Sequence, residues 1–141
     1  MKPFTTITAD ERKSEFCVDI GDKELGVNVK YYADGHVWVS VDEWHQVSPT
    51  YGHWWCVLAS ENVTDVANDL DAIRECFHGH KYRLKRTVRD WQSFVNIGRA
   101  EQNRGKKAYY SKLANETKAR IPELAARWKL CKQLWKEITK L

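Results

Sequence analysis

Long apolar runs, paired cysteines and signal-peptide features are all missing from this chain of 141 residues. No stretch reaches the ~18 apolar residues that a membrane helix needs. The first residues, MKPFTTITADERK, contain no apolar core of a signal peptide. The cysteines are scattered, which is typical of buried thiols in a reducing compartment; they are Cys17, Cys56, Cys76 and Cys131. We therefore expect a cytoplasmic protein without membrane contact.

Catalytic fingerprints are missing too, because the sequence has no G-x-S-x-G, P-loop, H-E-x-x-H or dinucleotide motif. Its metal-like spacings are His53-x-x-Cys56 and Cys76-x-His78-x-His80, and neither matches a standard zinc arrangement. We expect no enzymatic activity, no cofactor and no metal. A hydrolytic site is the minor alternative, and its general acids and bases would come from a set without fixed spacing: His36, His45, His53, Asp34, Asp42 and Glu43.

Charge is unevenly distributed along the chain, although the formal net charge is only +4. Residues 1–79 carry 6 Lys/Arg against 14 Asp/Glu, which gives −8. Residues 80–141 carry 17 Lys/Arg against 5 Asp/Glu, which gives +12. Opposite charge on two parts of one sequence indicates an interaction surface. The two parts could pack together, two chains could associate head to tail, or the basic part could meet phosphate.

Alternating apolar residues predict strands between residues 14 and 59. The register of one turn can be tested by this alternation. A two-residue loop, Asp34-Gly35, would turn the apolar stripes of its two strands to opposite faces of the sheet. A three-residue loop that begins one residue earlier pairs Val29 with Val39 and puts Gly35 at the left-handed position that such loops favour. We therefore predict the three-residue loop.

Helical periodicity begins near residue 62 and predicts three to four helices. Gly79 is expected to end the first helix, which is acidic. Further helices are predicted over about 81–103, about 106–120 and about 122–140, with Pro122 as the first residue of the last one. That last helix carries a heptad-like apolar stripe: Leu124, Trp128, Cys131, Trp135 and Ile138.

The predicted fold class is α+β, with an N-terminal antiparallel β-meander of about four strands followed by three to four α-helices, the last ones basic. A loop is expected at 48–52, before the last strand. One domain spans residues 1–141, with the sheet in 1–60, the acidic helix in 61–80 and the basic helical part in 81–141.

The predicted nucleic-acid surface lies on the basic helices. Only Asp90 and Glu101 interrupt residues 80–107, against nine Lys/Arg. Each cation that engages a phosphate releases condensed counterions, so such a surface favours nucleic acid. No zinc-finger spacing, RNP motif or GXXG loop is present, and we expect phosphate contacts without sequence-specific readout. The predicted contact residues are Lys81, Arg83, Lys85, Arg86, Arg89, Lys129, Lys132, Lys136 and Lys140.

The alternative function is that of a small regulator or inhibitor, of the compact kind that phages and other mobile elements encode, which occludes a partner protein. Seven tryptophans are many for this length, and exposed tryptophans are frequent at the centres of protein interfaces. The predicted partner contacts are Asp65, Asp69, Trp38 and Trp54. The apolar stripe of the last helix is also compatible with a homodimer.

Overall fold

The computed structural model describes residues 4–7, 11–63 and 66–141. The chain divides into two compact units. The first unit comprises residues 1–78 together with 131–141, and the second comprises residues 79–130. The first unit contains the sheet and the second is entirely helical apart from one connecting turn.

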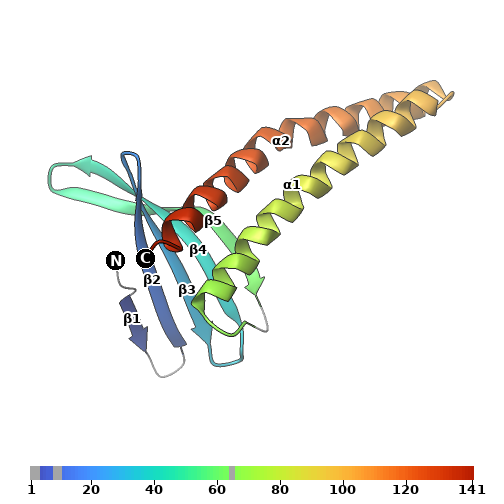
Figure 1. The fold of residues 1–141 in the computed structure, drawn as a ribbon. Helices are drawn as coiled ribbons and strands as arrows, with labels where there is room; N and C mark the ends of the chain where they lie inside the picture. The colour runs from blue at the N-terminus through green and yellow to red at the C-terminus, as the bar shows by residue number, and fades with distance from the viewer. Residues whose placement is uncertain (1–3, 8–10, 64–65) are drawn as a thin grey trace. The chain divides into compact units, whose positions relative to one another are not determined.

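The sheet of the first unit is antiparallel, with its strands in the order β1-β2-β3-β4-β5 (Figure 1). The four predicted strands correspond to β2 through β5, and the short β1 precedes them along one edge. The predicted loop at 48–52 shrinks to a turn at residues 49–50, because β4 and β5 continue to it from both sides. The strands are β1 Phe4–Ile7, β2 Glu11–Ile20, β3 Lys23–Tyr32, β4 Val37–Ser48 and β5 Tyr51–Val63.

The predicted three-residue loop between β3 and β4 is confirmed. Val29 pairs with Val39 and Tyr31 with Val37, which is the register that keeps both apolar stripes on one face. Gly35 has a φ of 87°, a left-handed value that glycine adopts without steric cost. The alternation of β-branched residues therefore fixes the pairing of these strands.

The core of the first unit forms between one face of the sheet and the helix segments of that unit. Leu25, Val27 and Val39 are fully buried from the sheet. Ile73 from the first helix and Leu134 from the second are fully buried with them. Burial of side chains of this size contributes about 1.5–3 kcal/mol each relative to leaving them exposed.

The α+β class is confirmed, but the prediction of three to four helices is wrong. Within residues 66–141 the chain forms two helices, α1 (Asp69–Ala100) and α2 (Arg104–Ile138). The separate acidic helix over 61–80 does not exist, because β5 runs to Val63 and α1 continues through Gly79.

Two residues that favour helix ends caused this error. Gly79 inside a helix costs only about 1 kcal/mol relative to alanine, and its φ is not left-handed. Pro122 lies inside α2 rather than at its start. The Pro122 side chain is exposed, whereas Ile121 is half-buried and Leu124 is buried. The apolar stripe therefore continues past Pro122, and packing along this stripe maintains the helix.

Asparagine caps start both helices. Asn68 Oδ1 accepts from the backbone N–H of Asp71 at 2.9 Å, and Asn103 Oδ1 accepts from the N–H of Lys106 at 3.1 Å. Each cap satisfies one of the N–H groups that a helix start leaves without an intrahelical partner.

The second unit is an antiparallel pair of helices, residues 79–100 of α1 and 104–130 of α2. The less exposed residues of α1 recur at alternating intervals of four and three, which is the coiled-coil spacing: His80, Leu84, Thr87, Trp91, Phe94 and Gly98. On α2 the same spacing holds for Thr117, Ile121, Leu124 and Trp128. One stripe of each helix thus faces the other helix, and most of the remaining residues of both helices are exposed.

Candidate nucleic-acid interface

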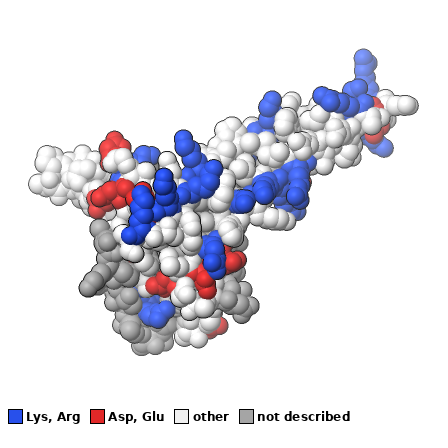
Figure 2. All heavy atoms as spheres, in the orientation of Figure 1, with Lys and Arg blue, Asp and Glu red and all other residues white. Residues whose placement is uncertain are grey.

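The two units differ sharply in charge. The second unit holds 14 Lys/Arg against 4 Asp/Glu, which gives +10, and the first unit is −6. The sequence split overestimated the basic part, because residues 131–141 with their three lysines belong to the acidic unit. Figure 2 shows Lys and Arg side chains along the helical unit, with few carboxylates among them on this face.

Most cations of the second unit have no acidic neighbour. Within the described residues, only Lys112 and Arg127 of this unit lie within 4.0 Å of a carboxylate, that of Glu116 and of Glu123 respectively. Exposed pairs of this kind contribute little. The positive potential of the hairpin is therefore largely uncompensated within the unit, as a phosphate-binding surface requires.

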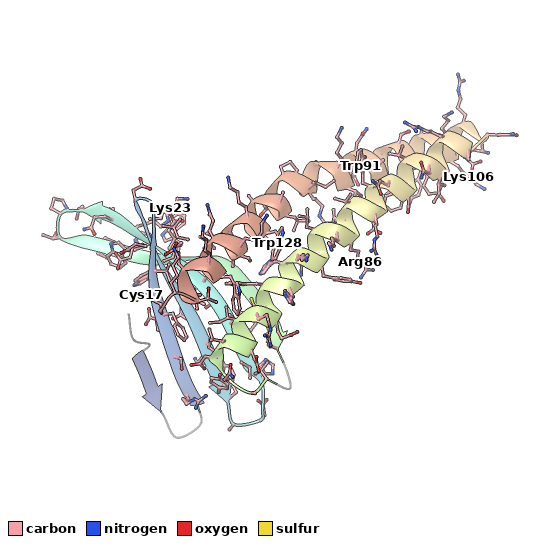
Figure 3. All side chains as sticks on the ribbon, viewed as in Figure 1. Cys17, Lys23, Arg86, Trp91, Lys106 and Trp128 are labelled. Atoms are coloured by element: carbon pink, nitrogen blue, oxygen red, sulfur yellow. The ribbon has the colours of Figure 1, made fainter. Side chains whose placement is uncertain are left out.

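The densest basic patch lies on the first turns of α1 in this unit. Lys85, Arg86 and Arg89 are exposed around Tyr82, a tyrosine with 59% of its surface accessible. The spacings of three and four residues put all of them on one helix face, and Figure 3 shows Arg86 pointing away from α2. We call these four residues the α1 patch. It offers cations for phosphates and an aromatic ring on which a base can stack.

Two lysines contact tryptophans across the helix pair. Lys81 Nζ lies 5.6 Å from the ring centroid of Trp128, and Lys118 Nζ lies 5.4 Å from that of Trp91 (Figure 3). Each pair joins α1 to α2, in opposite directions. Lys81, a predicted contact residue, is half-buried and so has a structural partner, whereas the predicted Arg83 is exposed beside the α1 patch.

His80 occupies the seam between the helices and is 3% exposed. Burial lowers the pKa of His80 below its usual value of 6.5, and the charges of Arg83 and Arg127 lower it further. The imidazole is therefore neutral at neutral pH, and it adds no charge to the surface.

The four predicted lysines of the last helix are divided between the units. Lys129 belongs to the second unit, and Lys132, Lys136 and Lys140 belong to the first. All four side chains are exposed. Lys140 Nζ lies 3.2 Å from Glu137 Oε1, so its charge is partly compensated by that carboxylate.

The predicted partner residues lie in different surroundings. Trp38, Trp44 and Trp54 share the sheet face opposite the core, and Trp54 is 40% exposed. Asp69 is engaged inside the first unit, where it accepts from the hydroxyl of Tyr31 at 2.5 Å and lies 4.0 Å from Arg12. Asp65 lies outside the described residues.

A group of rings on β4 and β5 was not predicted as a unit. His45 and His53 both stack on Trp55, with ring centroids 4.9 and 5.4 Å apart. His45 Nε2 lies 3.6 Å from Glu43 Oε2, while His36 sits at the other end of the sheet, in the turn before β4. Cross-strand pairing brings these residues together, and the register shifts between β4 and β5 are not visible in residue spacing.

The metal-like spacings do not converge. His53 and Cys56 lie three residues apart on β5, so they face opposite sides of the sheet. Cys76 and His78 differ by about 200° around the continuous helix α1. Within the described part of the chain, no group of three His, Cys, Asp or Glu side chains is arranged to hold a metal ion.

Comparisons of the chain with protein families, with curated proteins and with solved structures find no match. Of the helices that the structure describes, none combines the length and the apolar character that a membrane crossing requires.

Proposed function

We propose that this protein binds DNA or RNA without catalysing a reaction, and that the helical second unit contacts phosphates. The observation that carries the proposal is the uncompensated charge of that unit, 14 cations of which two meet a carboxylate among the described residues. A solvated helix face normally interleaves both signs of charge. Here the interleaving is nearly absent, and surfaces of this type are the electrostatic footprint of nucleic-acid binding.

The α1 patch is the centre of the proposed interface. Its three cations have no carboxylate within 4.0 Å among the described residues, and Tyr82 stands exposed between them. Phosphate contacts by such residues position a strand without reading its sequence. The proposal therefore describes general binding, with a preference set by the shape and the strandedness of the nucleic acid.

A salt titration tests this proposal. Binding of labelled duplex DNA, single-stranded DNA and RNA is measured by fluorescence anisotropy as the salt concentration rises from about 50 mM. The variant carries Lys85→Gln, Arg86→Gln and Arg89→Gln. Its log–log slope should be shallower than that of the wild type by roughly 2 to 3, because each lost phosphate contact removes about 0.7 to 0.9.

The matched control removes three cations from the acidic unit by Lys13→Gln, Lys23→Gln and Arg74→Gln. It changes the net charge equally, and its slope should match the wild type. Equal weakening by both triple variants would reduce the effect to net charge and overturn the assigned surface. Absence of binding by the wild type at low salt would overturn the function itself.

A second candidate function, binding of a partner protein, rests on Trp54. This exposed side chain reaches toward β3 on the sheet face opposite the core, and its ring lies 3.6 Å from where a side-chain carbon would stand at Gly26. Exposed tryptophan on a flat surface suits an interface centre. Trp54→Ser should abolish co-purification of such a partner while far-UV circular dichroism stays unchanged. Sedimentation of the wild type and of Trp54→Ser tests whether that partner is a second copy of this chain.

A further inference from the structure

A cavity of about 290 Å³ that is open to solvent on one side lies in the second unit, toward the turn that joins the helices. Residues of both α1 and α2 line it, and none of them belongs to the α1 patch. In the sequence, the two cations of the lining, Arg99 and Lys107, belong only to the general basic pattern. Its lining residues are Phe94, Val95, Gly98, Arg99, Lys107, Ser111, Ala114 and Asn115.

Small residues in the helix seam create this space. Gly98 and Ala114 are both buried, at positions where coiled coils normally place large apolar side chains. A side-chain carbon at Gly98 would stand 3.4 Å from Tyr110 Cβ, so the helices already approach closely at this level. The open space therefore results from the small size of Gly98 and Ala114, and not from a wide separation of the helices.

The lining is divided into an apolar interior and a polar rim. Phe94 and Val95 are half-buried, and the four polar residues of the rim are exposed. Among the described residues, Arg99 and Lys107 have no carboxylate within 4.0 Å, which leaves both cations available. Ser111 and Asn115 add a hydroxyl and an amide, groups that both donate and accept hydrogen bonds.

This combination fits a ligand with three properties. The ligand has an apolar face for Phe94, a hydrogen-bonding edge for Asn115 and an anionic group for Arg99 and Lys107. The volume of about 290 Å³ lies just below the range for small-molecule sites, about 300–1,000 Å³, so it accommodates no more than a single ring system. A nucleobase with its own phosphate has all three properties.

We infer that this cavity receives one unpaired nucleotide of a single-stranded nucleic acid. The base lies against Phe94, and the adjoining phosphate lies between Arg99 and Lys107. The inference rests on the proposed function and deepens it, because it assigns a preference for single strands over duplex. Bases in a duplex are stacked and paired, and extracting one costs a few kcal/mol.

The test compares one sequence of about 12 nucleotides as a labelled single strand and as a duplex, a length within the span of a small binding module. Ser111→Phe fills the cavity without changing charge. Ala119→Phe is the matched control, because Ala119 is an exposed residue of α2, the helix that carries Ser111, and belongs neither to the cavity lining nor to the α1 patch. Far-UV circular dichroism verifies that both variants remain folded.

The wild type should prefer the single strand. Ser111→Phe should lower single-strand affinity at least about fivefold, the lower limit for one stacked base, and should leave duplex affinity unchanged. Ala119→Phe should behave as the wild type. Equal loss for both forms, or no loss for either, would overturn the inference and leave the proposed function standing. No binding of either form by the wild type would overturn the proposed function, and the inference with it.

A charge-matched pair gives a second readout that does not depend on filling the cavity. Arg99→Gln with Lys107→Gln removes the rim cations, and Arg104→Gln with Lys106→Gln removes two exposed cations near the same turn that do not line it. The rim variant should reduce the preference for single strands, and the control should weaken both forms alike. Identical behaviour of the two pairs would contradict the inference.

Discussion

Gly52 lies directly beneath the indole of Trp44, so closely that a side-chain carbon at position 52 would come within 2.3 Å of Trp44 Cζ2. The indole is held from two other sides. Its Nε1 donates to Gln46 Oε1 at 3.0 Å, and its ring meets that of Trp54 edge to face at a centroid distance of 5.3 Å. Gly52 thus makes room for an aromatic contact between β4 and β5.

Gly52→Ala should therefore displace the Trp44 ring and break its contact with Trp54. Overpacking of this kind costs typically 1–3 kcal/mol, and we expect about 1 kcal/mol here because the site lies near the turn between the strands. Near-UV circular dichroism should lose tryptophan signal. Gly21→Ala is a useful comparison, since Gly21 has open space around it but a left-handed φ of 62°; it should destabilise the protein and leave the tryptophan signal intact.

The hydroxyl of Tyr31 ties β3 to the first turn of α1 through Asp69. Tyr31→Phe should lower the free energy of unfolding by about 1–2 kcal/mol, because the half-buried carboxylate loses a hydrogen bond to a charged acceptor. Urea unfolding followed by tryptophan fluorescence measures this change. Tyr32→Phe is the control, since Tyr32 is exposed and should unfold as the wild type.

The same contact makes a prediction for alkaline pH. Burial raises the pKa of Tyr31 to about 12, and the Asp69 carboxylate contributes to the rise. A raised pKa in the folded state means that the stabilisation is complete below the unfolded value of about 10. It is lost as the pH rises from about 10 to about 12. Ultraviolet titration should show a late-ionising tyrosine that is missing from Tyr31→Phe; an unchanged curve would contradict the assignment.

The buried His80 predicts a loss of stability at acid pH, whereas Tyr31 predicts one at alkaline pH. Its pKa in the folded state is lowered below 6.5, so the unfolded chain binds more protons as the pH falls below about 6.5, and stability falls with it. His80→Leu should remove this part of the acid sensitivity, because leucine fits the seam as a neutral side chain. Helix unfolding at about pH 5.5 and about pH 7.5 measures the difference. His78→Leu, at an exposed neighbouring position, should retain the acid sensitivity, and a similar loss there would contradict the role of His80.

The parts of the fold that follow local rules could be predicted from the sequence. Alternation across Gly35 decides the register, because a shift of one residue would turn every apolar side chain of a strand to the wrong face. The heptad stripe from Leu124 to Ile138 was visible because helical spacing is also a local pattern. Helix ends were not, because tertiary packing overrides the weak local preference of a glycine such as Gly79.

The candidate sites depend on contacts that residue spacing does not contain. The cluster of His45, His53 and Trp55 requires the pairing of β4 with β5. That pairing contains register shifts, and the sequence does not show where they fall. The cavity depends on Gly98 and Ala114 meeting across two helices, and only the paired seam makes that visible. Small residues at heptad positions were the available signal, and they lay in the predicted helices at about 81–103 and about 106–120, whose pairing the sequence left open.

Pro122 provides the sharpest test of the two-helix unit. Proline inside a helix removes one backbone hydrogen bond and crowds the carbonyl four residues earlier, at a cost of about 3 kcal/mol. Pro122→Ala should therefore raise the stability of the second unit, by roughly 1–3 kcal/mol after the gain in unfolded-state entropy is set against it. Glu123→Ala, its exposed neighbour, should change stability by less than about 0.5 kcal/mol. If residue 122 began a separate helix, alanine would instead remove a favoured first residue and stability would fall. The sign of the change in urea midpoint, with helix content measured by circular dichroism, thus decides whether α2 runs unbroken from Arg104 to Ile138.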